Sequence, residues 1–172
     1  LEGQTDACIF QRRENSLGNP MNSMLKLPAL DLLGGDIVLD RVEDAIIAIA
    51  HGEMVIVVDD ADRENEGDLI MAADAVTAAD INFMATEGRG LICVSLSAER
   101  LQQLDLPQMV PNNTEYLSTG FTVTCDLRDG TTTGISVSDR ARTIRALADE
   151  GRIPADFSRP GHVFPLRAHP EG

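Results

Sequence analysis

The sequence predicts an α+β or α/β fold, a three-layer arrangement in which helices pack on a mixed, twisted sheet. Short apolar runs typical of strands alternate along the chain with capped, amphipathic segments typical of helices. Such alternation indicates a mixed or mainly parallel sheet. The chain has 172 residues, of which 43% are apolar, so it is long enough to bury one core of ordinary size.

The N-terminal part of the chain lacks these signals. Residues 1–35 show no sustained hydrophobic period and contain several glycines and prolines, including the segment Gly18-Asn19-Pro20. We therefore expect residues 1–35 to form a loosely ordered leader, followed by one domain over residues 36–172.

The first helix and the first strand are expected directly after this leader. Asp40, with an acidic residue three positions later, is an N-cap signature for an amphipathic helix that ends at Gly52. The run 54–58 is continuously apolar and mostly β-branched, which predicts a strand covered on both faces.

The middle of the domain repeats this order. Thr77 and Asp80 have the spacing of a helix N-terminus, and we expect this second helix to end at Gly88. The apolar run 91–96 predicts a second buried strand, after which Ser97 begins a short third helix.

The last third of the chain adds one strand, one helix and an extended segment. Residues 121–126 alternate as a strand does, and Asp129-Gly130 marks a turn behind them. Ser138 is placed to cap a final helix that ends before Gly151. Residues 153–167 contain three prolines and are expected to be extended.

Charge and composition exclude several classes of function. The chain carries 28 acidic and 14 basic residues, a net charge of -14, which opposes binding to nucleic acid or to an anionic membrane surface. No apolar run approaches the roughly 18 residues of a membrane span, and the opening lacks signal-peptide features, so we expect a cytoplasmic protein. Cys8, Cys93 and Cys125 show no C-x-x-C spacing, which predicts neither a disulfide framework nor a zinc site.

The acidic loop, residues Asp59–Asp68, is the most distinctive segment. It holds six carboxylates in ten residues directly after the first strand. A bound cation would relieve their mutual repulsion, and ligands in open α/β sheets bind at the carboxyl ends of strands. Oxygen ligands with no cysteine or histidine nearby favour Mg²⁺ or Mn²⁺ over zinc.

Other interpretations of the acidic loop differ in how well they fit. A solvated, charged connection remains open, because runs of charge are often only hydrated. A calcium-binding loop is disfavoured, since Ala73 stands where such a loop needs a bidentate glutamate. Arg63 lies among the carboxylates, which favours bidentate contact with an anionic ligand such as a sugar phosphate.

Four stretches resemble, in order and spacing, the 3,4-dihydroxy-2-butanone 4-phosphate synthase family. They are Asp59–Asp68, Gly90–Cys93, the pair Gly120–Thr124 and Thr132–Ser136 with Asp139-Arg140, and Arg159–Arg167. Together they span most of the chain, which makes the resemblance specific. It implies a lyase that converts D-ribulose 5-phosphate to formate and 3,4-dihydroxy-2-butanone 4-phosphate with Mg²⁺ or Mn²⁺, usually as a homodimer.

The resemblance also implies roles for particular residues. The expected chemistry starts with loss of a proton beside a ketone, which gives an enediolate. A divalent cation stabilises this enediolate, and a carboxylate or an imidazole moves protons in the steps that follow. The implied residues are the metal ligand Glu64, the substrate contacts Arg63, Asp68 and Thr133, and the catalytic residues Glu66, His162 and Cys93.

Each of these roles has a structural alternative. His162 also fits an ordinary loop histidine. Cys93 lies in an apolar run and also fits a core residue. Ser136, Ser138 and Asp139 fit helix caps better than catalytic residues.

The resemblance further implies a glycine-rich turn and an R-x-GHTEA segment after the last of the four stretches, with a histidine that shares the metal. Because the sequence stops at Gly172, we expect an incomplete chain that binds metal weakly. Two alternatives stay open. One is an inactive homologue that acts as a binding or assembly subunit, and the other is a metal-dependent phosphosugar isomerase.

Overall fold

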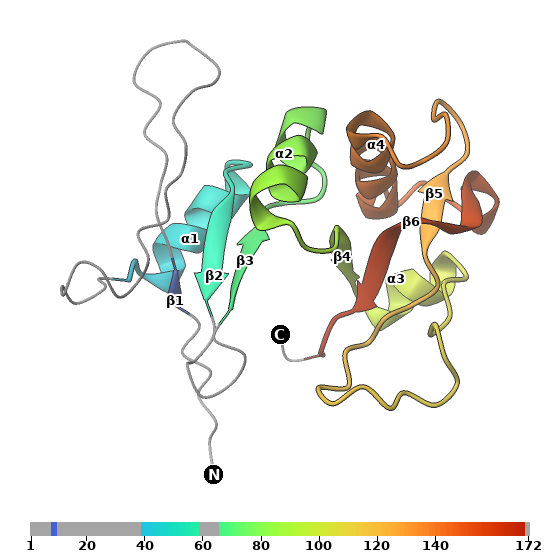
Figure 1. Ribbon diagram of the computed structural model, residues 1–172, viewed down its shortest axis with the longest axis horizontal. Helices are drawn as coiled ribbons and strands as arrows, with labels where there is room; N and C mark the ends of the chain where they lie inside the picture. The colour runs from blue at the N-terminus through green and yellow to red at the C-terminus, as the bar shows by residue number, and fades with distance from the viewer. Residues whose placement is uncertain (1–7, 10–38, 59–65, 171–172) are drawn as a thin grey trace. The chain divides into compact units, whose positions relative to one another are not determined.

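The computed structural model describes residues 8–9, 39–58 and 66–170, which are divided into two compact units between Ile70 and Met71 (Figure 1). Each unit has a sheet with helical packing against it, and the sheet of unit 2 is mixed. The predicted α+β class is therefore confirmed. No helix among these residues is long and apolar enough to cross a membrane.

Unit 1 is built on a three-stranded antiparallel sheet. Its strands, in the order β1-β2-β3, are β1 (Cys8–Ile9), β2 (Val55–Val58) and β3 (Gly67–Ile70). Helix α1 (Val42–Ala50) packs on this sheet through the buried residues Ala45 and Val55. Two residues of the predicted leader thus belong to the sheet, and the rest of residues 1–35 lies outside the described part of the chain.

Two predictions for the start of unit 1 are wrong. Helix α1 has Arg41 rather than Asp40 at its N-cap, without a side-chain cap hydrogen bond, and the Arg41 guanidinium lies 3.1 Å from the Glu43 carboxylate. The following strand is not covered on both faces, because Val55 alone is fully buried in β2. Its apolar run reflects one packed face and a partly covered second one.

Strand β3 was not predicted, because its first residues look like the end of the acidic loop. Val58 of β2 pairs with Gly67, and Val57 pairs with Asp68, so the last residues of that segment are in a strand. A strand needs a partner backbone as much as an apolar pattern, and β2 supplies it. Residues 59–65 of the predicted loop lie outside the described residues.

Unit 2 is built on a mixed sheet in the order β4-β6-β5. β4 runs parallel to β6, and β5 runs antiparallel to it. The strands are β4 (Cys93–Leu96), β5 (Cys125–Leu127) and β6 (Phe157–Arg167). The helices are α2 (Ala78–Phe83), α3 (Ala98–Gln103) and α4 (Val137–Ala148), with a π-helical turn η1 (Met84–Gly88) and a 3₁₀ turn η2 (Pro154–Asp156).

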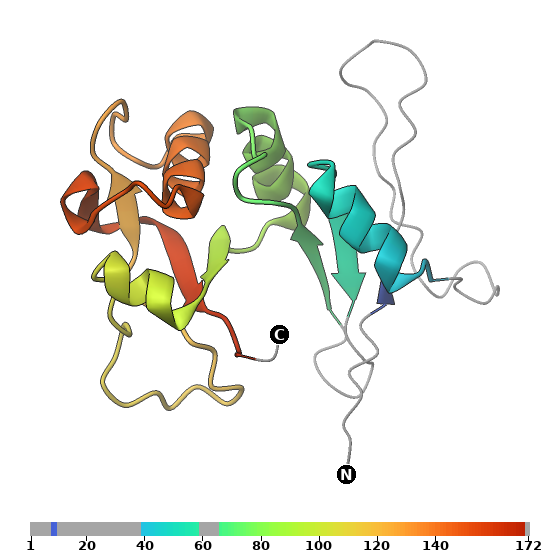
Figure 2. The same ribbon diagram turned by 180° about the vertical axis from the view of Figure 1, so that it is seen from behind.

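The core of unit 2 lies between these helices and one face of the sheet. In both views α4 runs beside β5 and β6 (Figures 1 and 2). Side chains alternate along β4, where Val94 and Leu96 are buried and Cys93 and Ser95 are exposed. The strand predicted over 91–96 is therefore confirmed at Cys93–Leu96, but it is buried on one side, because only one face of the sheet carries the core. The largest fully buried side chains of this core include Phe157, Ile81, Leu104, Leu147 and Val163.

The helix caps of unit 2 mostly follow the predictions. Thr77 and Asp80 form a reciprocal capping box, and Ser97 accepts a hydrogen bond from the Arg100 amide at 3.1 Å. The cap of α4 is Ser136 instead of the predicted Ser138. The predicted strand over 121–126 is also displaced, because only its last two residues enter β5.

Candidate active site

A four-residue excursion in β6 forms the centre of the candidate site. Cys125 of β5 pairs with Val163, whereas the next residue, Asp126, pairs with Ser158. One step along β5 therefore spans residues 159–162 on β6, which leave the ladder as an enlarged bulge. These residues are the Arg-Pro-Gly-His motif of the sequence, so the motif shapes the backbone as well as supplying a histidine.

Arg159 and Gly161 each have a structural reason to be in the bulge. The Arg159 guanidinium donates to the carbonyls of Leu104 at 2.5 Å and Pro154 at 3.2 Å, and the peptide before Pro160 is cis. Gly161 lies so close to β5 that an added Cβ would overlap the backbone of Cys125 and the next amide nitrogen. Only glycine allows this approach.

The bulge brings His162 onto the carboxylate of Asp126. The His162 amide donates to Asp126 Oδ1 at 2.8 Å, and the ring Nδ1 lies 2.7 Å from Oδ2. A carboxylate acceptor at this place favours the imidazole tautomer with its proton on Nδ1, which leaves Nε2 to exchange one with a ligand. The His162 side chain is 41% exposed and that of Asp126 only 12%, so the imidazole can reach a ligand while its partner is held inside.

Sequence reasoning missed Asp126 as a site residue. The signal was a carboxylate at the end of the alternating segment 121–126, and this carboxylate is buried in β5. Burial of a charge is costly unless it is hydrogen-bonded, which marks such a residue as a candidate for function.

The loop before α4 lies against this pair. Gly134 has a backbone φ of +91°, and a Cβ there would overlap Asp126 Oδ2 and lie 2.7 Å from His162 Nδ1. Thr133, predicted to contact the substrate, is the preceding residue and is exposed. The structure therefore brings Thr133 next to the residue that touches the histidine pair.

Asp139 holds this loop in place. Its Oδ2 accepts hydrogen bonds from the Thr132 hydroxyl at 2.7 Å and from the amides of Thr132 and Gly134, each at 3.1 Å. The Thr132 hydroxyl is the main cause of a pKa below the usual range for the Asp139 carboxyl, and the two amides add to it. Asp139 is thus a loop-binding residue in the first turn of α4 as well as a favourable charge there.

The lowered pKa of Asp139 predicts an acid-sensitive contribution to stability. A carboxyl whose pKa is lower folded than unfolded stabilises the fold above the unfolded value, about 3.9, and loses this effect as pH falls through the folded value. We expect Asp139→Asn to destabilise the chain at neutral pH and the gap between variant and parent to narrow below about pH 4. Urea unfolding at several pH values measures this, and a gap that stays constant down to acid unfolding would contradict it.

Cys93 lies on the face of β4 that does not carry the core. It pairs with Phe164 in parallel register, and Phe164 follows Val163, whose buried side chain belongs to the core. Cys93 is exposed, so its interpretation as a core residue is wrong. Cys125 is the buried cysteine, and burial chiefly, with the charge of Asp126, raises the pKa of its thiol to about 12, which keeps it protonated.

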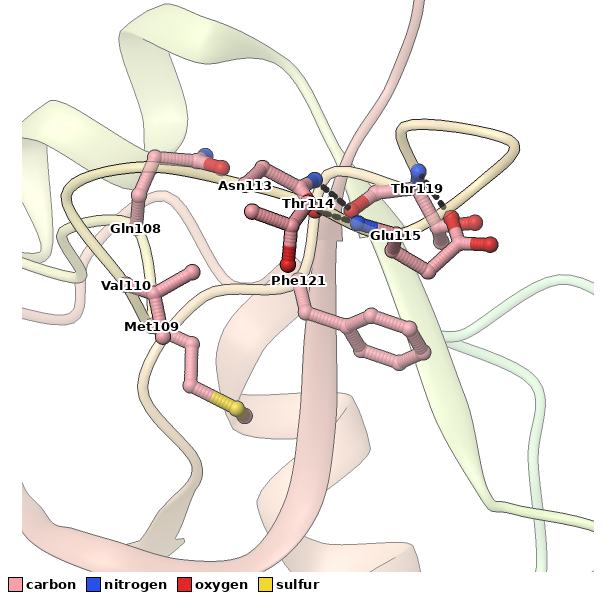
Figure 3. Close-up of a pocket in the computed structure, with 8 residues that line it drawn as sticks. All are labelled: Gln108, Met109, Val110, Asn113, Thr114, Glu115, Thr119 and Phe121. Atoms are coloured by element: carbon pink, nitrogen blue, oxygen red, sulfur yellow. Dashed lines mark hydrogen bonds between the residues drawn. The ribbon is translucent and has the colours of Figure 1, made fainter.

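A hollow of about 280 Å³ is lined by residues 108–121, the loop between α3 and β5 (Figure 3). Its loop is braced by the Glu115 carboxylate, which accepts from the amides of Leu117 at 2.9 Å and Thr119 at 2.8 Å. The hydrogen bond from the Leu117 amide, followed by that from the Thr119 amide, holds the pKa of the Glu115 carboxyl below its usual range. Phe121 lines the hollow and packs edge to face on Phe164, with ring centroids 6.5 Å apart.

The other predicted site residues belong to unit 1. Asp68 lies in β3, Glu66 is the residue directly before this strand, and both residues are exposed. Arg63 and Glu64 lie outside the described residues. The predicted metal ligand Glu64 therefore remains a prediction. Within residues 8–9, 39–58 and 66–170, no three metal-binding side chains come together.

Comparison with known proteins gives these features a context. The family model for 3,4-dihydroxy-2-butanone 4-phosphate synthase matches residues 43–172. A synthase of that name from Agrobacterium fabrum is 62% identical over 132 residues, which cover 77% of this chain and 62% of that protein. The riboflavin biosynthesis protein RibBA of Aquifex aeolicus is 59% identical over 135 residues, covering 77% of this chain and 33% of that protein.

Solved structures agree with this comparison. A crystal structure of 3,4-dihydroxy-2-butanone 4-phosphate synthase in complex with two magnesium ions is 50% identical, with a TM-score of 0.75, over 77% of this chain and 62% of that one. The chain therefore spans about three fifths of the length of this synthase and of the Agrobacterium relative. It belongs to the 3,4-dihydroxy-2-butanone 4-phosphate synthase family.

Proposed function

We propose that the protein is a lyase of riboflavin biosynthesis that converts D-ribulose 5-phosphate to L-3,4-dihydroxy-2-butanone 4-phosphate and formate. The observation that carries the proposal is the Asp126–His162 pair, built from a bulge in a chain that matches the synthase family over residues 43–172. Proton transfer at carbon needs a base whose orientation is fixed, and this pair supplies one.

The other predicted site residues have separate roles in this proposal. His162 Nε2 moves a proton to or from the substrate, while Asp126 fixes the ring from the other side. Cys93 is a further catalytic candidate, and Glu66 is a further candidate for proton transfer. Arg63, Asp68 and Thr133 bind the substrate. The guanidinium and the hydroxyl counter the repulsion between a sugar phosphate and an acidic protein.

We infer that the reaction uses Mg²⁺ or Mn²⁺ and that Glu64 is a ligand of the ion. The acidic segment supplies hard oxygen ligands, which suit these cations, and a relative has been crystallised with two magnesium ions. The bound ion would stabilise the enediolate oxygens. We further propose that the protein is cytoplasmic and acts as a homodimer. Light scattering of the purified chain measures its oligomeric state.

Formate release with ribulose 5-phosphate tests the function. We expect Mg²⁺-dependent formate from the chain, alone or joined to the parts of the Agrobacterium relative that lie outside the match. Glu64→Gln should lower the affinity for Mg²⁺, measured by titration calorimetry, by at least the roughly 10- to 100-fold that loss of a residue behind a metal ligand costs. Glu150→Gln, at an exposed position beyond α4, is the control. An aldose product without formate would indicate an isomerase instead, and no turnover in either form would favour a binding subunit.

A further inference from the structure

Asp139 is connected to the histidine pair by two routes, one from its carboxylate and one from its backbone carbonyl. Through the loop, its Oδ2 binds the Gly134 amide, and Gly134 lies against both Asp126 and His162. Through the helix, its carbonyl accepts from the Thr143 hydroxyl at 2.9 Å, and Thr143 Oγ1 accepts from the Leu127 amide at 3.0 Å. Leu127 directly follows Asp126, so α4 is tied to β5 beside the pair.

These contacts are well placed to keep their geometry. Asp139 is 3% exposed and Thr143 is fully buried, so water does not compete strongly for the hydrogen bonds between them. The Asp139 amide is fixed in turn by the Ser136 hydroxyl at 3.0 Å. The loop is therefore held from α4 at a point that the rest of the core also fixes.

Gly134 transmits this position to the histidine. It has no side chain, so its backbone can lie directly beside Asp126 Oδ2 and His162 Nδ1. A Cβ at this position would overlap these atoms. If the loop moved away, the imidazole and the carboxylate would have room to rotate and to separate. If the loop moved closer, it would displace them.

We propose that Asp139 is a positioning residue for His162, which acts by holding Gly134 against the Asp126–His162 pair. It thereby keeps the proton on Nδ1 and Nε2 directed toward the ligand. This inference rests on the proposed function for its effect on turnover, but the effect on the imidazole itself is independent of the reaction. A helix cap alone would stabilise α4 and leave the histidine unchanged.

The chain contains a matched control for each part of this arrangement. Asp80 Oδ2 accepts from the Thr77 amide at 2.9 Å and from the Thr77 hydroxyl at 2.6 Å, the same kind of contact at a cap in α2. Gly130 has a φ of +77°, close to that of Gly134, but its added Cβ would meet only the end of the Arg142 side chain at 3.8 Å. Variants of Asp80 and Gly130 reproduce the loss of a cap and the backbone strain without touching the pair.

The first test observes the imidazole directly. Long-range ¹H–¹⁵N spectra of the purified chain at alkaline pH report which ring nitrogen of His162 carries the proton. The parent should show the Nδ1–H tautomer. Asp139→Asn and Gly134→Ala should shift His162 toward the Nε2–H form that prevails in isolated histidine, whereas Asp80→Asn and Gly130→Ala should retain the parent's spectrum.

The second test measures turnover in whichever form of the protein releases formate. Loss of positioning should lower kcat of Asp139→Asn by about 10- to 100-fold, with little change in KM, because small displacements of a catalytic group are costly. Its pH profile should change, while that of Asp80→Asn should match the parent. If the parent makes no formate but Asp139→Asn still shifts the tautomer, the proposed function is wrong and the positioning role is supported.

The proposal is overturned if His162 has the same tautomer in Asp139→Asn as in the parent, or if Asp80→Asn alters it equally. Gly134→Ala is the most disruptive of these changes. Should it fail to fold, Thr132→Val removes only the hydroxyl bond to Asp139 and is expected to produce a smaller shift in the same direction. No shift in either Asp139→Asn or Thr132→Val would again reject the proposal.

Discussion

Replacement of Gly161 by alanine is expected to lower the free energy of unfolding by about 3 kcal/mol or more and to remove the histidine site. The added Cβ would overlap the backbone between Cys125 and Asp126, which belongs to β5 and has no flexible side chain to move. The bulge must then move away from β5. This breaks the bond from the Gly161 amide to Thr124 Oγ1, 3.0 Å long, and separates His162 from its carboxylate.

Urea unfolding measures the loss of stability, and the tautomer of His162 reports the loss of the pair. Gly90→Ala is the matched control, because a Cβ there meets only the carbonyl oxygen of Gly88 at 3.9 Å. It should change the unfolding free energy by less than about 1 kcal/mol. Equal stability of the two variants would show that the bulge is not held as closely to β5 as the structure indicates.

Replacement of His162 by glutamine should lower kcat for formate release by about 10²- to 10⁴-fold, the range of a general acid or base. Glutamine can keep a hydrogen bond to Asp126 but cannot exchange a proton near neutral pH. Asp126→Asn should also be strongly impaired, because an amide can donate to Nδ1 and so favour the wrong tautomer.

His51→Gln is the control for this pair of variants, since His51 is an exposed residue at the end of α1 in unit 1. It should retain the parent's kcat. Thermal unfolding of each variant separates a catalytic loss from a loss of fold. If His162→Gln turned over at the parent's rate, the imidazole would have no role in the chemistry and the site would have to be sought elsewhere.

Local signals predicted the local parts of unit 2 well. The capping box of Thr77 and Asp80 and the cap at Ser97 were predictable because a cap depends on residues three positions apart. The cap of α4 was misplaced by two residues because three polar residues, Ser136, Ser138 and Asp139, compete there. Asp139 binds the preceding loop, and this leaves Ser136 to accept from its amide.

Errors in the strands have a different cause. The exposed face of β4 was invisible in the sequence, because Leu91–Leu96 is apolar enough to fit a strand buried on both sides. Strand β3 was missed because its hydrogen bonds come from β2, while its own first residues are charged or glycine. Both outcomes depend on which backbone and which helices lie alongside, and neither is encoded in a short window.

By itself, the sequence determined the α+β class, the caps at Thr77 and Ser97, and, through its family motifs, the candidate residues Thr133, Cys93 and His162. Only the tertiary structure supplied Asp126 as the partner of His162, 36 residues away, and Gly134 and Asp139 behind them. The physical reason is that caps and apolar patterns act over a few residues. The histidine pair depends instead on the register between β5 and β6, where four extra residues fold the chain back onto a buried carboxylate.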